Sequence, residues 1–172
     1  MELPLAYYRD PVLRRKTAKV NGIDDELRQL VADMIETLHV YDGVGIAAPQ
    51  VHHSLALFIT CVPTQRGGKW SQGSDRVFIN PQILETSQET QVTSEGCLSI
   101  PNLYLNIIRP KKITIQAVDM EGNPFQETFK GFEAANFLHE YDHLNGILIV
   151  DRLEKDERKE LISLFQTSQG VP

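Results

Sequence analysis

The chain has 172 residues, of which 41% are hydrophobic and 23% are charged, so we expect an ordinary globular fold with a single domain over residues 1–172. Its formal net charge of -6 disfavours contact with a nucleic-acid backbone, and we expect no direct nucleic-acid binding. No apolar run approaches a membrane span of ~20 residues, so we do not expect a membrane protein. No signal or transit pattern opens the chain and only two cysteines occur, so we do not expect a disulfide-rich secreted protein. The predicted location is the cytoplasm.

The first half of the chain combines one helical pattern with several strand patterns. Apolar residues at spacings of three and four predict an amphipathic helix over about 24–39, with Asp24 as its N-cap. The segment 43–50 contains two glycines and two alanines, which let the backbone closely approach either a ligand or another strand. Strands are then expected at 55–60, 76–81 and 82–92, with a surface loop at 63–75.

The second half continues with short strands and two helices. Strand patterns occur at 105–108, 112–118, 125–130 and 147–150. A turn at 121–124 makes two of these strands a hairpin. A helix is predicted from about Phe132 to Asn145, with Gly146 as its stop, and a shorter one at 155–166.

The helix at 132–145 carries an H-E-x-x-H pattern, His139-Glu140-Tyr141-Asp142-His143. Residues four apart share one helical face, so both imidazoles can bind one metal ion. Glu140 is rotated by roughly 100° from His139 and can reach a water on that ion without being a ligand. Metal hydrolases use this pattern with the glutamate as general base, but by itself it fits two surface histidines equally well.

Cys97 lies in the segment Glu95-Gly96-Cys97-Leu98-Ser99, which we expect to form a tight loop between strands. A lone cysteine is most often an inert, small hydrophobic residue. With His139 and His143, however, it would complete a set of three protein ligands and leave one position open for water. We therefore predict an α+β fold in which mainly antiparallel strands pack around a central metal-binding helix, with helices toward the N- and C-terminal ends.

Three separated segments resemble the three signatures of the peptide deformylase family, in the same order. They are GVGIAAPQ at 43–50, EGCLS at 95–99 and HEYDH at 139–143. The resemblance covers nearly the whole chain. It implies a metal-dependent amidase that acts on a linear amide and removes the formyl group from the N-terminal formylmethionine of newly synthesised polypeptides.

The resemblance also implies a role for individual residues. The metal ligands of the family correspond to Cys97, His139 and His143. Glu140 corresponds to the general base, which assists attack by a metal-bound hydroxide, and Gln50 and the backbone N–H of Leu98 correspond to the oxyanion donors. One divalent ion is implied, Fe(II) in vivo, with Zn(II), Ni(II) or Co(II) able to take its place; the spacing of the ligands does not separate these metals.

A substrate pocket is expected on the helical face of His139 and beside the small-residue segment. The residues expected to enclose the methionine side chain are Val44, Gly45, Ile46, Phe132, Ala135 and Asn136, although each is explained equally well as core. Arg109 and Glu95 resemble an ion pair of the family that would brace the cysteine loop. Leu138 and Tyr104 depart from the family, which usually has glutamine and often arginine at or near these positions.

Formylated nascent peptides are the expected partners, with docking at the ribosome exit through a basic patch at 14–19. The chain is expected to act as a monomer in a bacterial-type cytoplasm. The alternative is an HExxH zinc peptidase that cuts internal peptide bonds, which leaves Cys97 and the segment 43–50 unexplained. A catalytically silent binding protein would have lost Glu140 or a ligand, and all are present.

Overall fold

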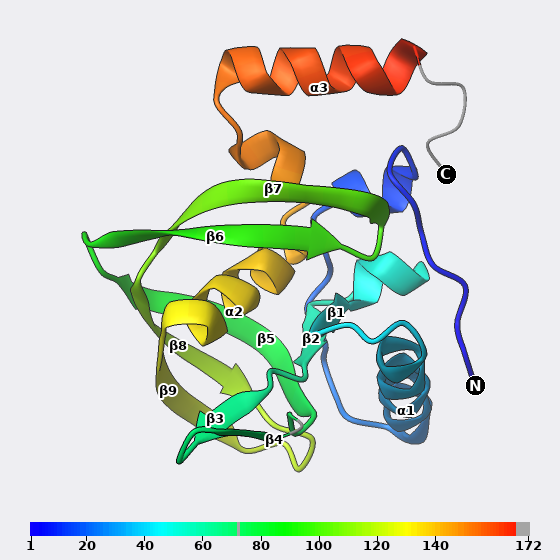
Figure 1. Cartoon of the computed structure of the whole chain (residues 1–172). Coiled ribbons are helices and arrows are strands. Elements are labelled where there is room, and N and C mark those ends of the chain that lie inside the picture. Colours follow the sequence, from blue (N-terminus) through cyan, green and yellow to red (C-terminus); the bar gives the residue numbers. More distant parts are fainter. Residues whose placement is uncertain (72, 168–172) are drawn as a thin grey trace.

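The computed structural model describes residues 1–71 and 73–167. Within these ranges, helix α2 (Gly131–Leu144) lies between two antiparallel sheets, with α1 (Asp25–Val40) beside one of them and α3 (Lys155–Thr167) beyond the other (Figure 1). The five-stranded sheet has the order β1-β2-β5-β8-β9. Its strands are β1 (Gly45–Ala47), β2 (Leu57–Thr60), β5 (Arg76–Thr86), β8 (Lys112–Val118) and β9 (Pro124–Lys130). The predicted α+β class is confirmed.

Two further sheets are hairpins. The one that covers α2 consists of β6 (Thr90–Cys97) and β7 (Ile100–Pro110), and the other of β3 (Thr64–Arg66) and β4 (Lys69–Ser71). Short 3-10 helices complete the described chain: η1 (Pro11–Arg14), η2 (Ala48–Val51) and η3 (Ile149–Arg152). No helix in the part of the chain that the structure describes is long and apolar enough to cross a membrane.

Helix α2 is held against the five-stranded sheet by aromatic packing. The Phe137 ring lies 4.9 Å from that of Phe58 and 5.2 Å from that of Phe78, both in edge-to-face geometry. Ten residues of α2 are buried, because the β6–β7 hairpin covers the face of the helix that the five-stranded sheet leaves open. Polar groups on that face, including both histidines, are therefore removed from solvent.

Helix α1 begins as the sequence predicts. The Asp24 side chain accepts a hydrogen bond of 2.8 Å from the backbone N–H of Leu27, and the apolar face of the helix packs against the sheet at β1 and β2. Helix α2 also matches its prediction to within one residue at each end. In both cases the signals are local, so they can be recognised without knowledge of the tertiary fold.

Three local predictions, at 63–75, 95–99 and 147–150, are wrong in whole or in part. The loop at 63–75 contains the β3–β4 hairpin. The tight loop expected at 95–99 is present only as a turn at Leu98 and Ser99, because Glu95–Cys97 end strand β6. The expected strand at 147–150 is replaced in part by η3, whose Ile149 and Val150 are buried. A short apolar run indicates burial, but burial is compatible with a helical turn as well as with a strand.

Strand β5 continues through Pro81, where we expected it to stop. Its pairing with β8 shifts register between Ile79 and Gln82, so that proline sits in an irregularity that needs no ladder hydrogen bond from it. The Asn80 side chain stabilises this irregularity, because it accepts from the backbone N–H of Val20 at 2.9 Å and donates to its carbonyl at 2.8 Å.

Candidate metal centre and active site

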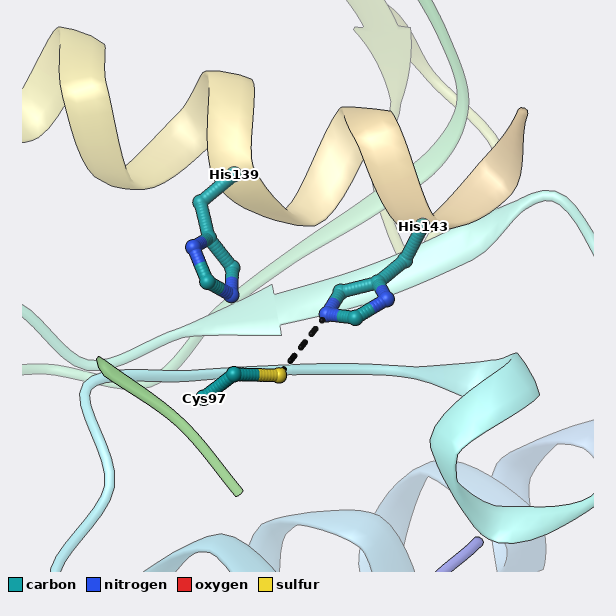
Figure 2. Close-up of side chains that lie close together, drawn as sticks. All are labelled: Cys97, His139 and His143. Atoms are coloured by element: carbon teal, nitrogen blue, oxygen red, sulfur yellow. Dashed lines mark hydrogen bonds between the residues drawn. The ribbon is translucent and has the colours of Figure 1, made fainter. Parts of the chain in front are cut away.

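The structure brings Cys97, at the end of β6, together with His139 and His143 on α2. Their possible ligand atoms all lie within 4.8 Å of one another, and Cys97 Sγ is 3.4 Å from His143 Nε2. Both imidazoles are directed from the helix toward the sulfur (Figure 2). His139 is 8% and His143 1% exposed, so the alternative of two surface histidines does not fit.

The donor chemistry of this group fits a divalent ion. A thiolate and two imidazoles suit iron, zinc, nickel and cobalt, and three protein ligands leave a position open for water. His139 Nδ1 lies 3.0 Å from Glu95 Oε1, which leaves Nε2 free to face the sulfur. Burial lowers the pKa of His143 well below its usual value, so this imidazole is neutral, as a ligand must be.

A buried ion-pair network supports the histidine side of this group. Arg109 donates to both oxygens of Glu95, at 2.9 and 2.8 Å, and to Asp142 at 2.7 Å. The predicted pairing of Arg109 with Glu95 is thereby confirmed. Burial acts to raise the pKa of Glu95, but hydrogen bonds from Arg109 and His139 outweigh it and bring the pKa to about 2. The carboxylate therefore stays charged and can orient His139.

Replacement of Arg109 by methionine is expected to destabilise the fold by about 3–5 kcal/mol, because it leaves the Glu95 and Asp142 carboxylates buried without their shared cation. Urea unfolding of both proteins measures the difference. The control is Lys111→Met, which removes an exposed ion pair with Glu89 and should cost less than about 1 kcal/mol. Equal stability of the two variants would contradict a structural role for the buried network.

Gln50 lies in η2 and is almost completely buried beside the sulfur. Its Oε1 accepts from the backbone N–H of Ala47 at 2.9 Å, which directs the amide NH₂ group toward the cavity. Nε2 lies 3.2 Å from Ser99 Oγ and 3.5 Å from Cys97 Sγ. A fixed donor of this kind can stabilise negative charge that develops next to the candidate metal centre.

Glu140 is 2% exposed, and its Oε2 has no hydrogen-bond partner among the described residues. Burial raises the pKa of this carboxyl group to about 7. A group with a pKa near neutrality can both take up and release a proton, as a general base and acid must. The backbone at Gly45 leaves the space for it, since a Cβ atom there would lie 2.3 Å from Glu140 Oε1.

One cavity of about 610 Å³, a size common for small-ligand sites, is lined by Gln50, Cys97, His139 and Glu140. Five of the six residues expected to enclose the methionine side chain line it: Val44, Gly45, Phe132, Ala135 and Asn136. Leu98 lines it as well. Asn136 donates to the Val44 carbonyl at 2.9 Å, which ties the rim of the cavity to α2.

Ile46 is the exception and corrects the prediction. It is fully buried in the core cluster that contains Met34 and Leu38 of α1. Successive side chains of a strand point to opposite faces, so when Gly45 faces the cavity Ile46 faces the core. The pairing of β1 with β2, in which Gly45 lies opposite Thr60, was needed to decide which residue faces which side.

Three residues near the site were not predicted to take part in it. Ser99 is completely buried and contacts the Gln50 amide, and Asp142 joins Arg109 to Arg152, at 3.0 Å from the Arg152 Nε. Tyr41 lines the cavity after the end of α1. Ser99 lies within the EGCLS motif and Asp142 within the HEYDH motif, so their positions in the sequence could have indicated a place near the site. No comparable signal marks Tyr41.

Comparison with known proteins agrees with this geometry. The family model for polypeptide deformylase matches residues 2–159. The chain belongs to this family. The peptide deformylase of Thermotoga neapolitana is 39% identical over 168 residues, 95% of this chain and 96% of the relative.

Two solved peptide deformylases have the same fold. The enzyme from Ehrlichia chaffeensis has a TM-score of 0.88 at 33% identity, covering 96% of each chain. A class I type b peptide deformylase from Acinetobacter baumannii, with Met-Ala-Ser bound, has a TM-score of 0.82 at 35% identity, over 89% of this chain and 99% of that one. The chain is accordingly a hydrolase that acts on N-formyl amides, in a family that is metal-dependent and removes formyl groups from nascent peptides.

The two departures from the family pattern lie in different environments in this chain. Leu138 is 7% exposed, packs in the core cluster of Phe58 and Phe137 and does not line the cavity. Tyr104 is 75% exposed, lies against Gly96 and lines the cavity. Any effect on substrate preference is therefore expected from Tyr104 and not from Leu138.

Proposed function

We propose that the protein removes the formyl group from the N-terminal formylmethionine of newly synthesised polypeptides, with one divalent ion at Cys97, His139 and His143 and with Glu140 as general base. The observation that carries this proposal is that the three ligands meet beside one cavity, which is lined by Cys97, His139 and the buried Glu140. Glu140 Oε2 has no hydrogen-bond partner among the described residues. Fe(II) is the proposed ion in vivo, and Zn(II), Ni(II) or Co(II) would suit the same donors. When bound, the ion would lower the pKa of a water molecule so that a nucleophile exists near neutral pH.

The residues of the chain would then manage protons and charge. Glu140 would take the proton of the attacking water and pass it to the leaving amine, for which its pKa of about 7 is suited. The Gln50 amide, and with it the backbone N–H of Leu98, would stabilise the negative charge that develops on the formyl oxygen when the formyl carbon is attacked. Loss of one such donor typically lowers kcat by roughly 10²–10³.

The methionine side chain would lie in the cavity beside Val44, Gly45, Phe132, Ala135 and Asn136. The related Acinetobacter baumannii enzyme was solved with Met-Ala-Ser bound, a peptide that begins with methionine. A formylated form of the same peptide is therefore a suitable test substrate.

The test is formate release from formyl-Met-Ala-Ser by protein purified anaerobically with Fe(II). Acetyl-Met-Ala-Ser and a peptide with blocked ends serve as comparison substrates. We expect formate from the first and no cleavage of the others. Cleavage of an internal peptide bond would favour the HExxH peptidase, and a lack of formate with one iron bound per chain would refute the proposed substrate.

We further propose that one domain over 1–172 acts as a monomer in a bacterial-type cytoplasm and docks near the ribosome exit. Arg14 is paired with Asp151, whereas Arg15, Lys16 and Lys19 are exposed on the same segment. If this patch docks, reversing the charges of Arg15 and Lys16 should weaken co-sedimentation with ribosomes at low salt and leave formate release from the free peptide unchanged. Unchanged co-sedimentation would exclude the patch.

Replacement of Gly45 by alanine is expected to lower kcat by about 10²-fold, because the new methyl group would displace the Glu140 carboxyl group from the cavity. Steady-state formate release measures the effect. Gly22→Ala is the matched control, since a Cβ atom at Gly22 would have no neighbour within 4 Å. Full activity of Gly45→Ala would show that the position of Glu140 is not critical.

A further inference from the structure

A second group of metal-binding side chains lies outside the active-site cavity. It consists of His39 near the end of α1, Cys61 directly after β2 and Asp75 directly before β5. Their ligand atoms lie within 4.8 Å of one another. Within residues 1–71 and 73–167, this group and the Cys97 group are the two that meet this condition.

The contacts in this group already point its donors at one another. His39 Nε2 lies 2.8 Å from Asp75 Oδ1, and the Cys61 sulfur lies within 4.8 Å of a ligand atom of each. Cys61 is a free thiol and 9% exposed, whereas the side chains of His39 and Asp75 are 45% and 28% exposed. The sulfur thus forms the base of the group, and the imidazole and carboxylate form its rim, where an ion can enter from solvent.

Strand pairing and close backbone contacts position Cys61 and Asp75. The pairing of β2 with β5 ends at Thr60 opposite Arg76, so the next residues in this register are Cys61 and Asp75. The backbone N–H of Cys61 also donates to the Val44 carbonyl at 2.8 Å. The segment that leads to Asp75 lies close against Cys61, because a Cβ atom at Gly73 would be 2.7 Å from the Cys61 carbonyl carbon. Donors on such elements need little rearrangement to close on an ion.

We propose that His39, Cys61 and Asp75 form a second metal site, which takes Zn²⁺. One sulfur, one nitrogen and one oxygen donor are all ligands that this borderline-soft ion accepts in tetrahedral geometry, with water in the fourth position. The competing interpretation is a histidine–aspartate hydrogen bond beside a buried thiol, with no ion. Zinc binding converts the thiol to a thiolate and releases its proton, whereas the competing interpretation predicts no proton release.

Binding at this site would restrain one rim of the active-site cavity. Two residues after His39, the chain enters the segment 41–44, and all four residues of this segment line the cavity. A zinc ion would link that segment to β2 and β5. The inferred role is structural, since Glu140 and the other residues proposed for catalysis are not part of the group.

Zinc stoichiometry tests the site directly. The full-length protein is dialysed against increasing zinc, and metal per chain is measured by elemental analysis. We expect two zinc ions per chain for the wild type and for His53→Ala, an exposed histidine in neither group, and one for Cys61→Ser. The loss of affinity should exceed the roughly 10–100-fold typical for removal of an outer-shell partner.

Two more variants make the outcome decisive. Cys97→Ser should keep the second ion and lose the first, which separates this site from the proposed catalytic one. His39→Ala changes an exposed residue, so it provides the same test as Cys61→Ser if the buried serine impairs folding. One zinc per wild-type chain, with no change in Cys61→Ser and His39→Ala, would overturn the proposal.

Discussion

Replacing Glu140 by glutamine is expected to lower kcat for formyl-Met-Ala-Ser by about 10²–10⁴-fold, the range typical for loss of a positioned general base. Glutamine keeps the volume of the side chain at a position that is 2% exposed, but it cannot accept the proton of the attacking water. The metal ligands are unchanged, so the iron content should equal that of the wild type. Steady-state formate release together with iron analysis measures both quantities.

The matched control is Glu133→Gln, which changes an exposed glutamate in the first turn of the same helix. It should retain wild-type kcat. If Glu140→Gln kept more than about a tenth of wild-type kcat with full iron content, another group would have to take the proton. A large loss of iron in this variant would instead mean that Glu140 takes part in holding the ion.

The parts of the site that could be predicted are those whose geometry is local. His139 and His143 meet because one helical turn separates them, and local signals, including the stop at Gly146, placed that helix to within one residue at each end. The position of Cys97 depends on the β6–β7 hairpin that covers α2, and no spacing in the sequence gives that contact. Its predicted partnership with the histidines came from the number of ligands that a catalytic metal requires, and the structure places the three together.

The failures share a different cause. Whether Ile46 or Gly45 faces the cavity depends on the pairing of β1, and a shift of one residue would exchange their faces. The continuation of β5 through Pro81 depends on an irregularity in its pairing with β8. The Asn80 side chain stabilises it by hydrogen bonds to the backbone of Val20, which is distant in the sequence. In each case the local sequence is compatible with two conformations, and a contact between residues distant in the sequence determines which of them forms.

Segment 43–50 shows that two local interpretations can both hold. We expected its small residues to allow close approach of either a ligand or another strand. Gly45 pairs with Thr60 in the sheet, and on its other side it gives the Glu140 carboxyl group its space. The same residue thus joins the sheet to the site, which explains why a single methyl group there is expected to affect activity.

Replacing His143 by alanine is expected to remove one iron per chain and to reduce formate release to background. His143 is 1% exposed, its Nε2 faces Cys97 Sγ at 3.4 Å, and loss of this donor would leave two protein ligands for the ion. Removal of an outer-shell partner alone typically costs 10–100-fold in metal affinity, so loss of a direct ligand should cost more. Iron per chain after anaerobic gel filtration and formate release are measured on the same sample.

A buried histidine leaves a cavity when it is truncated, so a second variant is needed to separate metal loss from unfolding. Cys97→Ser changes one atom and keeps the side-chain volume, but it replaces a soft thiolate by a weakly binding hydroxyl group. It should lose the same iron while its unfolding by urea stays cooperative. His53→Ala, an exposed histidine, should keep both iron and activity. Full iron content in folded His143→Ala and Cys97→Ser would place the ion elsewhere, and the role proposed for Glu140 would lose its basis because its carboxyl group would no longer lie next to the activated water.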